Sequence, residues 1–465
     1  MQQKTEGMRQ ENAFSHYTDG TERYLNPADI ILPPGYNIEV FAQGLDMPIS
    51  MIFTENGDLI FAELGYSTGN PRILRLIEGR FEVVAENFNV PITGLSYNED
   101  EGVLYVSHRG FISVVELDGT RRNIITGLPS NGDYINNRIV FGPDNKMYFG
   151  QGTTTNSGVV GLDNEWIYTN PLVCDYAGEY IMLDGQNFET DNILIENPQK
   201  EKIYTGAYSP YGIANTPYET RKGVIRASGS ILRANLDGSE LELYAWGFRN
   251  PSYLKFDNTN RLFVSNNGFE IRGSRPIANA YDEFFLVTPG VWYGWPDYNG
   301  GEPITSPRFK PEGGPQPEFL FTQHPNIPPR PYAFFPMNSV IRGFDFNYNP
   351  SFGTYGDVYI AELGRSGLRI GRDTTPYTGT GQKVSKIDMK TGGVSTFAIN
   401  KSGFPASVTK EGGLERPTEV VFGPDGSMYV LDLGWNVDIE SNLFLPNSGV
   451  IWRIWKDGQQ DLSLQ

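Results

Sequence analysis

The stretch PTEVVFGPDGSMYVLDLG, residues 417–434, decides the fold, because two short apolar runs flank the turn residues Gly-Pro-Asp-Gly. This order predicts a β-hairpin, in which a tight turn joins two antiparallel strands. The pattern recurs five more times along the chain. The other copies are PISMIFTENGDLIFAELG (48–65), PITGLSYNEDEGVLYVSHRG (91–110), NRIVFGPDNKMYFGQG (137–152), PSYLKFDNTNRLFVSNNG (251–268) and IRGFDFNYNPSFGTYGDVYIAELG (341–364).

A third apolar strand follows most copies and a fourth follows often, as in RILRLIEG (72–79) and FEVVAEN (81–87). Four antiparallel strands repeated around an axis make the blades of a propeller. The last copy lacks its outer strand because the chain ends soon after GVIWRIWKDG (449–458), and residues 37–43 supply the missing strand. The sequence therefore predicts an all-β fold, a six-bladed β-propeller closed by an N-terminal strand in the last blade. An all-β sandwich is the alternative, but it needs no sixfold repetition.

The domain organisation follows from this repeat. Residues 1–25 are polar and contain no apolar run, so we expect a disordered arm without a signal peptide or transmembrane segment. Residues 26–465 are expected to form the propeller. Two insertions, at about 152–228 and 288–340, break the rhythm and are rich in Pro, Gly, Asn and Tyr. Insertions of that length are usually functional or disordered, and we expect these two to cover one mouth of the central channel.

The composition excludes several classes of function. The formal net charge is −18 and no Lys/Arg cluster reverses it locally, so a nucleic-acid partner is not expected. Cys174 is the only cysteine, which excludes an intramolecular disulfide and Cys-rich zinc sites. The chain has three histidines, His16, His108 and His324, so a His-dependent metal site or hydrolase has few candidates.

The second strand of every copy ends in a polar residue. These six residues are Glu63, His108, Gln151, Asn266, Glu362 and Asp432. Repetition places them on one mouth of the channel, where such a ring suits a polar ligand or a cation with oxygen ligands. The alternative is that they cap turns and solvate the channel. Clustered carboxylates raise one another's pKa, which is a common feature of functional sites.

Three segments of the chain are similar to one known family. RNPSYLKFDNTNRLFVSNNG (249–268), DEFFLVTPGVWYGWP (282–296) and NRIVFGPDNKMYFGQG (137–152) resemble the glucose/sorbosone dehydrogenase family, the soluble quinoprotein sugar dehydrogenases with six-bladed propellers. The similarity covers about residues 35–456. It implies oxidation of a sugar or other alcohol with pyrroloquinoline quinone (PQQ) and calcium at the channel mouth, and an electron acceptor. It also implies a periplasmic or extracellular location.

The resemblance assigns residues to the cofactor. Arg249 and Asn250 match the arginine and asparagine that lie by the cofactor, and Arg249 is also a catalytic candidate. Asn89 stands where the family has a glutamine, and Arg365 follows the position of a family lysine. The remaining cofactor-binding candidates at the mouth are Gln151, Arg138 and Glu63.

The resemblance also assigns residues to calcium. Gly268 and Phe269 fall where two backbone carbonyls hold the cofactor's calcium, and Asp282, Glu283 and Tyr293 match a structural calcium site. Taken alone, two adjacent carboxylates suit either a hard cation or a solvated turn.

The proton acceptor departs most clearly from the family pattern. A histidine is expected four residues before Arg138, and this chain has Tyr134 there. An unperturbed tyrosine has a pKa of about 10, so it is a poor general base near neutral pH. Asp133 and His108 are the alternative candidates for that role.

Three functions therefore stay open at this point. The first is a PQQ-dependent sugar or alcohol dehydrogenase with an altered base. The second is a non-catalytic propeller that binds a saccharide or a protein on the same mouth. The third is a lactonase-type hydrolase with a cation held by ring residues such as Glu63, Asn266 and Asp432.

Overall fold

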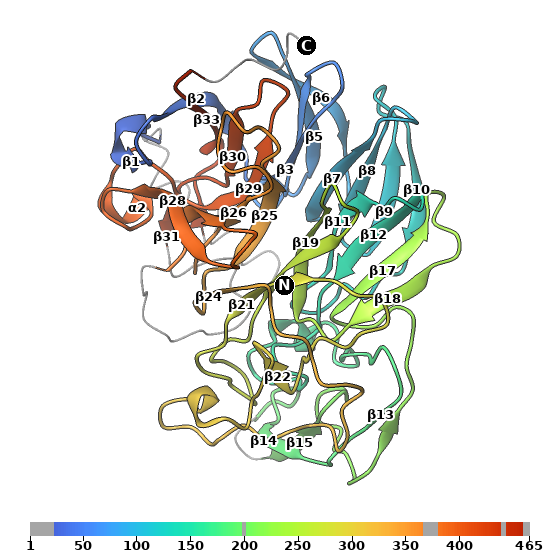
Figure 1. Ribbon diagram of the computed structural model, residues 1–465. Helices are drawn as coiled ribbons and strands as arrows, with labels where there is room; N and C mark the ends of the chain where they lie inside the picture. Colours follow the sequence, from blue (N-terminus) through green and yellow to red (C-terminus); the bar gives the residue numbers. More distant parts are fainter. Residues whose placement is uncertain (1–22, 198–200, 366–379, 439–442, 459–465) are drawn as a thin grey trace.

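The structure is a computed structural model that describes residues 23–197, 201–365, 380–438 and 443–458. In this part of the chain, six four-stranded antiparallel arrays are arranged around a central axis, and one of them gains a short fifth strand (Figure 1). The predicted six-bladed β-propeller is confirmed. The four strands of each blade run in chain order from the innermost strand outward, apart from the last blade, whose outermost strand is N-terminal; the short fifth strand at the edge of the fifth blade is N-terminal as well.

The strands of the first three blades are β3 (Pro48–Phe53), β4 (Leu59–Glu63), β5 (Arg72–Ile77) and β6 (Arg80–Glu86); β7 (Ile92–Asn98), β8 (Val103–His108), β9 (Phe111–Val115) and β10 (Arg121–Thr126); and β11 (Asn136–Phe141), β12 (Lys146–Gln151), β17 (Ser230–Asn235) and β18 (Glu242–Trp246).

The strands of the last three blades are β19 (Asn250–Phe256), β20 (Leu262–Asn267), β21 (Asp282–Leu286) and β24 (Ala333–Phe335); β25 (Ile341–Phe346), β26 (Val358–Glu362), β27 (Lys383–Ile387) and β28 (Val394–Asn400), with β1 (Ile30–Ile31) at its edge; and β29 (Pro417–Phe422), β30 (Met428–Asp432), β33 (Gly449–Lys456) and β2 (Tyr36–Leu45).

The shorter elements lie between or beside the blades. They are η1 (Pro27–Asp29), η2 (Glu165–Tyr168), β13 (Ile181–Met182), β14 (Asn187–Asp191), β15 (Lys202–Gly206), β16 (Thr220–Arg221), β22 (Tyr298–Asn299), β23 (Glu302–Pro303), η4 (Pro307–Phe309), α2 (Ala406–Thr409), β31 (Asn436–Asp438) and β32 (Leu443–Phe444).

The second strands of the blades are buried on both faces, which explains their near-continuous apolar sequences. Every residue of β4, β26 and β30 is buried, because neighbouring blades cover both sides of each sheet. The innermost strands approach one another closely. A Cβ at Gly94 would lie 2.4 Å from the Cα of Arg138, so only glycine allows blade 2 to meet blade 3 at that point.

The ring closes as the sequence predicts. Strand β2 pairs with β33 in the last blade, with Asn37 opposite Trp455 and Gln43 opposite Val450. This pairing covers the edge that an open array would expose. Residues 1–22 of the expected arm lie outside the described residues. Arg23 is anchored to the last blade, where its guanidinium lies 2.6 Å from Asp432.

The strand register defines one mouth of the channel. The first residue of an innermost strand pairs with the last residue of the second strand, as in Pro48 with Glu63 and Ile92 with His108. The same register recurs in the other blades. The polar strand ends therefore all lie at the same end of the blades.

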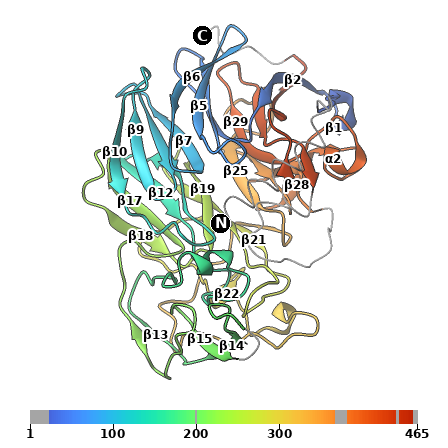
Figure 2. The same ribbon diagram turned by 180° about the vertical axis from the view of Figure 1, so that it is seen from behind.

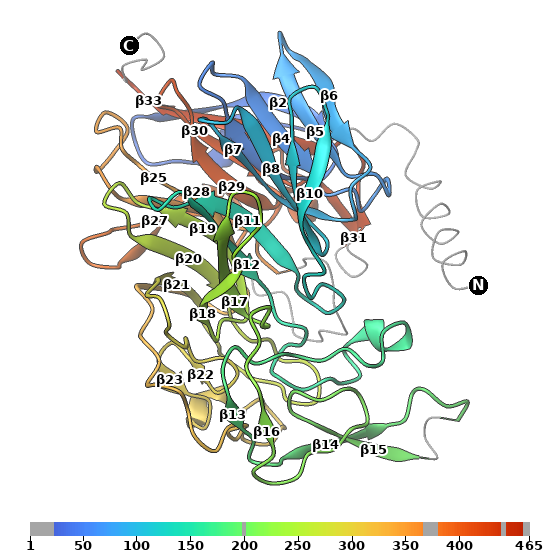
Figure 3. The same cartoon turned by 90° about the vertical axis from the view of Figure 1, so that its right-hand side faces the viewer.

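The two insertions pack against each other outside blades 3 and 4. Residues 152–229 connect β12 to β17, and residues 287–332 connect β21 to β24. Figures 2 and 3 show their short strands, β13 to β16 with β22, grouped at one end of the molecule. Backbone contacts join them, because Asp184 donates to Leu320 O at 2.8 Å and Thr322 donates to Met182 O at 2.9 Å. Buried aromatic residues of both insertions form one apolar cluster.

Candidate functional site at the channel mouth

The polar strand ends hold the connections between blades. Glu63 accepts a hydrogen bond from Asp46 N at 2.8 Å, and Asp432 accepts from Glu415 N and Arg416 N at 2.9 and 2.7 Å. In each case the side chain satisfies backbone groups of the segment that leads into an innermost strand. These bonds match the alternative given above for the six strand-end residues, in which they cap turns instead of binding a ligand.

The other ring side chains are similarly engaged. Asn266 Oδ1 accepts from the backbone of Arg249 and Asn250 at 3.1 and 3.0 Å. Gln151 Nε2 donates to Pro129 O at 2.6 Å, and Glu362 accepts from Ser385 on the next strand of its blade. These internal hydrogen bonds fix the segments that form the channel mouth. They also leave fewer polar atoms of the ring available to a ligand.

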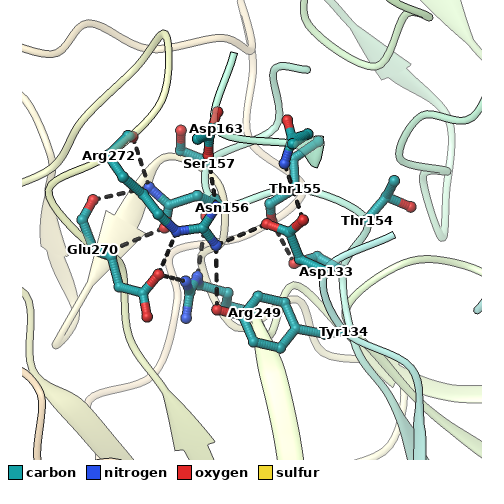
Figure 4. A network of polar contacts seen from close by, with 12 residues as sticks. Asp133, Tyr134, Thr154, Thr155, Asn156, Ser157, Asp163, Arg249, Glu270 and Arg272 are labelled. Atoms are coloured by element: carbon teal, nitrogen blue, oxygen red, sulfur yellow. Dashed lines mark hydrogen bonds and ion pairs between the residues drawn. The ribbon is translucent and has the colours of Figure 1, made fainter. Parts of the chain in front are cut away.

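A largely buried cluster of charges lies where the segments before β11, after β12, before β19 and after β20 meet (Figure 4). We call it the paired cluster; its members are Asp133, Asp163, Arg249, Glu270 and Arg272. At its centre, Arg272 lies 2.7 Å from Asp133 Oδ2 and 2.6 Å from Asp163 Oδ2, and it also pairs with Glu270. Arg272 is 4 % exposed. A buried cation with three carboxylate partners is a strong organiser of these three segments.

Arg249 is committed to the same cluster. Its Nη2 lies 3.0 Å from Glu270 Oε2, its Nε donates to Asn156 O at 3.2 Å, and its guanidinium lies 4.5 Å from the centre of the Tyr134 ring. Asn156 in turn bonds the backbone of Glu270 in both directions. The structure therefore brings together the predicted residues Arg249, Tyr134 and Asp133.

The charges of the paired cluster shift its pKa values in opposite directions. Burial opposes ionisation of Glu270, but Arg249 and Arg272 outweigh it and lower its pKa to about 2. Burial raises the pKa of Asp163 to about 6, against the attraction of Arg272. Burial also raises the pKa of Tyr134 to about 12. Tyr134 therefore keeps its proton at neutral pH, and its hydroxyl accepts a long hydrogen bond from Arg272 at 3.4 Å.

The two alternative bases are already occupied. His108 is 4 % exposed, its Nδ1 accepts from Asn89 N at 3.3 Å, and its Nε2 lies 2.8 Å from Ser113 Oγ. Burial lowers the pKa of His108 to about 4. Asp133 Oδ1 accepts hydrogen bonds from the side chains of Asn164 and Trp166, and Asp133 Oδ2 pairs with Arg272. Of the three predicted bases, only Tyr134 is more than slightly exposed.

The other side of the mouth carries cations without carboxylate partners. We call Arg109 and Arg342 the arginine pair. Arg109 follows β8, donates to the backbone carbonyls of Val90 and Ser130 at 2.6 and 2.9 Å, and also bonds to the side chain of Tyr66. Arg342, in β25, is half-buried, and no described residue forms a hydrogen bond or ion pair with its guanidinium. Burial lowers the pKa of Arg342, although Glu419 and Tyr66 act in the opposite direction.

Tyr66 interacts with both arginines, and the nearby carboxylate, Glu419, already has other partners. Burial raises the pKa of Tyr66, while Arg109 and Arg342 act to lower it. Glu419 pairs with Arg138 and accepts from Tyr253 Oη and Met51 N, each at 2.7 Å. The sequence patterns did not single out Arg109, Arg342 or Tyr66. The only available signal was their position beside the ends of the second strands or the start of an innermost strand.

The remaining cofactor candidates lie at the mouth in fixed positions. Asn250 is 7 % exposed, donates to Asn267 Oδ1 at 2.9 Å and accepts from Asn137 at 3.1 Å. Asn89 Nδ2 donates weakly to Arg109 O at 3.4 Å. Arg365, beside residues that the structure does not describe, accepts a hydrogen bond on its backbone carbonyl from Gln382 at 3.4 Å.

The residues expected to bind calcium are partly brought together. Asp282 accepts from Gly268 N at 2.7 Å and Val340 N at 2.6 Å, and Glu283 accepts from Asn266 Nδ2 at 2.8 Å and Gly300 N at 2.5 Å. Burial raises the pKa of Asp282 to about 7 and that of Glu283 to about 8.

Two further calcium candidates make contacts of another kind. Phe269 packs in the apolar cluster of the insertions, and the hydroxyl of Tyr293 bonds to Thr288 N and Leu286 O. Within the described ranges, no three His, Cys, Asp or Glu side chains converge as a ready metal site.

Together the fold and the site define a class: a six-bladed propeller with a polar mouth, in which one side is a buried ion-pair cluster and the other carries open arginines. No model of a known protein family matches the chain. A 189-residue stretch is 27 % identical to quinoprotein glucose dehydrogenase B of Acinetobacter calcoaceticus, covering 38 % of this chain and 29 % of that protein. The chain thus matches less than a third of the length of this curated relative.

Solved structures share the fold. The PQQ-bound aldose sugar dehydrogenase of Streptomyces coelicolor is 18 % identical with a TM-score of 0.51, covering 91 % of this chain and 99 % of that one. The holo PQQ domain of pyranose dehydrogenase from Coprinopsis cinerea is 14 % identical with a TM-score of 0.58, covering 94 % and 98 %. These findings confirm the resemblance to the glucose/sorbosone dehydrogenase family that the sequence motifs indicated. Among the described helices, none has the length and apolar character to span a bilayer.

Proposed function

We propose that the protein is a PQQ-dependent oxidoreductase-like propeller that acts on a sugar or another alcohol. The observation that carries this proposal is Arg342, a half-buried cation at the channel mouth that forms no hydrogen bond or ion pair with a described residue. A desolvated guanidinium is costly unless an anion approaches it. The similar proteins include a PQQ-bound aldose sugar dehydrogenase and the PQQ domain of a pyranose dehydrogenase.

The residues at the mouth fit a planar anion. The arginine pair offers donors that suit carboxylates, and Tyr66, which interacts with both arginines, adds a flat ring and a hydroxyl. Arg249 and Asn250 would border the same group from the side of the paired cluster. Gln151 Oε1, which is buried without a hydrogen-bond partner in the described residues, is a further polar atom for a ligand to satisfy.

The chemistry would be divided between the cofactor and the chain. PQQ, when bound, supplies the oxidising quinone that takes a hydride from an alcohol carbon. The chain's part would be to orient the alcohol, and Tyr134, whose pKa of about 12 keeps it protonated, would donate a hydrogen bond to it. With Asp133 and His108 occupied, no predicted base is free to take the proton. We therefore expect aldose oxidation to be slow.

The proposal also includes two calcium sites and a cellular location. The carbonyls of Gly268 and Phe269 would hold calcium beside the cofactor, and Asp282, Glu283 and the Tyr293 carbonyl would hold a second ion. For this second site, the buried carboxylates would exchange N–H donors for the cation. The proposed activity implies a sugar or alcohol substrate, a separate electron acceptor, and a periplasmic or extracellular location.

The substitution Tyr134→His tests the proposed activity. General-base catalysis is typically worth about 10²–10⁴-fold in rate, so a histidine at this position should raise PQQ-dependent glucose oxidation by a measurable part of that range. Tyr134→Phe is the matched control, since it keeps the ring under Arg249 but supplies no base. Rapid glucose oxidation by the unmodified protein would contradict the role given to Tyr134.

A second function is favoured by the occupied bases. A propeller that binds a saccharide or a protein without reaction needs no proton acceptor, and Tyr134, Asp133 and His108 would then be structural. The absence of PQQ binding at every calcium concentration would favour this function. Lactonase-type hydrolysis is less favoured, because Glu63, Asn266 and Asp432 direct oxygen atoms at backbone N–H groups.

A further inference from the structure

A cavity outside the channel lies beside the turn between β22 and β23. Its volume is about 500 Å³, within the range of small-molecule sites, and it opens to solvent. Its lining residues are Tyr281, Gly300, Gly301, Glu302, Arg308, Arg330 and Phe334. None of these residues takes part in the proposed oxidation.

The floor of this cavity is aromatic and fixed. The rings of Tyr281 and Phe334 meet edge to face at 5.2 Å. Asn299 holds the backbone of Tyr281 from both sides, accepting from its N at 2.7 Å and donating to its O at 3.0 Å. No described residue bonds the Tyr281 hydroxyl. The floor therefore combines two aromatic side chains with a hydroxyl that has no hydrogen-bond partner among the described residues.

A glycine turn forms one wall. Gly300 and Gly301 have φ of +66° and +73°, as a two-residue hairpin turn of type I′ requires. A Cβ at Gly300 would lie 3.1 Å from the Tyr281 ring, and one at Gly301 would lie 2.8 Å from Arg330 Cγ. Side chains at these positions would thus crowd the groups that line the cavity.

The rim carries two arginines, of which one is paired with a carboxylate and the other is not. Arg308 lies 4.1 Å above the Tyr281 ring, 3.3 Å from Glu302, and donates to Asn279 O at 2.5 Å. Arg330 is exposed and has no hydrogen bond or ion pair within the described ranges. Glu302 therefore neutralises one guanidinium, and one positive charge is left over in a chain whose net charge is −18.

We propose that this cavity binds a sugar acid, that is, a pyranose ring bearing one carboxylate. Arg330 receives the carboxylate, the aromatic floor receives the apolar face of the ring, and the Tyr281 hydroxyl and Glu302 receive its hydroxyl groups. One uncompensated cation matches one carboxylate. The proposal does not depend on PQQ or on oxidation at the channel mouth.

The test is a calorimetric titration of the protein, without quinone, with D-glucuronate. We expect one-to-one binding, with D-glucose and acetate each binding at least about tenfold more weakly, because each lacks one of the two recognised features. Arg330→Ala and Tyr281→Leu should each reduce glucuronate affinity about tenfold or more. Arg80→Ala, at an exposed arginine of β6, is the matched control and should leave it unchanged.

Other outcomes would overturn the proposal. Acetate or inorganic phosphate binding as tightly as glucuronate would mean that the cavity recognises charge alone. If Arg342→Ala removes glucuronate binding and Arg330→Ala does not, the ligand occupies the channel mouth. No binding by the unmodified protein would also refute the site. Because no arm uses PQQ, failure here and failure of the proposed oxidation are separately visible.

Discussion

The two sides of the channel mouth use arginine differently. In the paired cluster, Arg249 and Arg272 face three carboxylates, so the charges are compensated within the protein. In the arginine pair, Arg109 bonds to two backbone carbonyls and to Tyr66, and Arg342 forms no hydrogen bond or ion pair with a described residue. The difference indicates that the first side holds the first insertion, through Asp163, to the segments before β11 and after β20. An anionic ligand would interact more favourably with the second side, because its arginines have no carboxylate paired with them.

The largest expected effect comes from breaking the paired cluster. Arg272→Met leaves Asp133, Asp163 and Glu270 without their common cation, and uncompensated buried charges cost about 3–5 kcal/mol. Chemical denaturation should show a loss of that size in the free energy of unfolding. Arg261→Met is the control, because Arg261 is half exposed, pairs with Asp257 alone and should cost within about 1 kcal/mol. Equal losses in the two variants would show that the cluster is not the organiser of this side.

A second prediction concerns pH and the candidate base His108. Its pKa is lowered by burial from 6.5 to about 4, so the unfolded chain takes up the proton first as the pH falls. The stabilising contribution is complete above pH 6.5 and is lost between pH 6.5 and 4, by roughly 3 kcal/mol. His108→Gln should flatten the dependence of unfolding free energy on pH in that window. An unchanged slope would mean that His108 is accessible and free to act as a base.

A third prediction tests whether Asp282 and Glu283 bind calcium. If Asp282 and Glu283 bind it, calcium at about 100 times its Kd stabilises the folded protein by about 2.7 kcal/mol, and chelation reverses the gain. Magnesium should do less, since it demands shorter and more regular coordination. The melting temperature of Asp282→Asn should not respond to calcium. If calcium leaves the melting temperature of the unmodified protein unchanged, the two carboxylates serve only to accept the N–H groups of Gly268, Asn266, Gly300 and Val340.

The fold was predictable because its signal is local. Each hairpin is contained in about twenty residues, and the missing strand of the last blade could be inferred from the two ends of the chain. The direction of the ring side chains was harder to predict. Their place at the ends of the second strands puts Glu63 and Asp432 at the mouth. Whether their side chains face the channel or the inter-blade segments depends on contacts with Asp46 and Glu415.

The site was only partly predictable, because its main contacts join distant segments. Arg249 and Tyr134 were identified from motifs and do lie together. Arg272 escaped notice, since its partners Asp133 and Asp163 are more than a hundred residues away in the chain. Arg342 was hidden for the opposite reason: its significance is the lack of a partner, which no sequence pattern records.

The most direct test of the central claim is a titration of the protein with PQQ in the presence of calcium, followed by the absorbance of the bound quinone. We expect the unmodified protein to bind PQQ and Arg342→Gln to bind it at least about tenfold more weakly, a difference of about 1.4 kcal/mol, with an unchanged free energy of unfolding. If Arg342→Gln binds PQQ as tightly as the unmodified protein, or if the unmodified protein binds none at any calcium concentration, the assignment of the arginine pair as the anion-binding side is wrong.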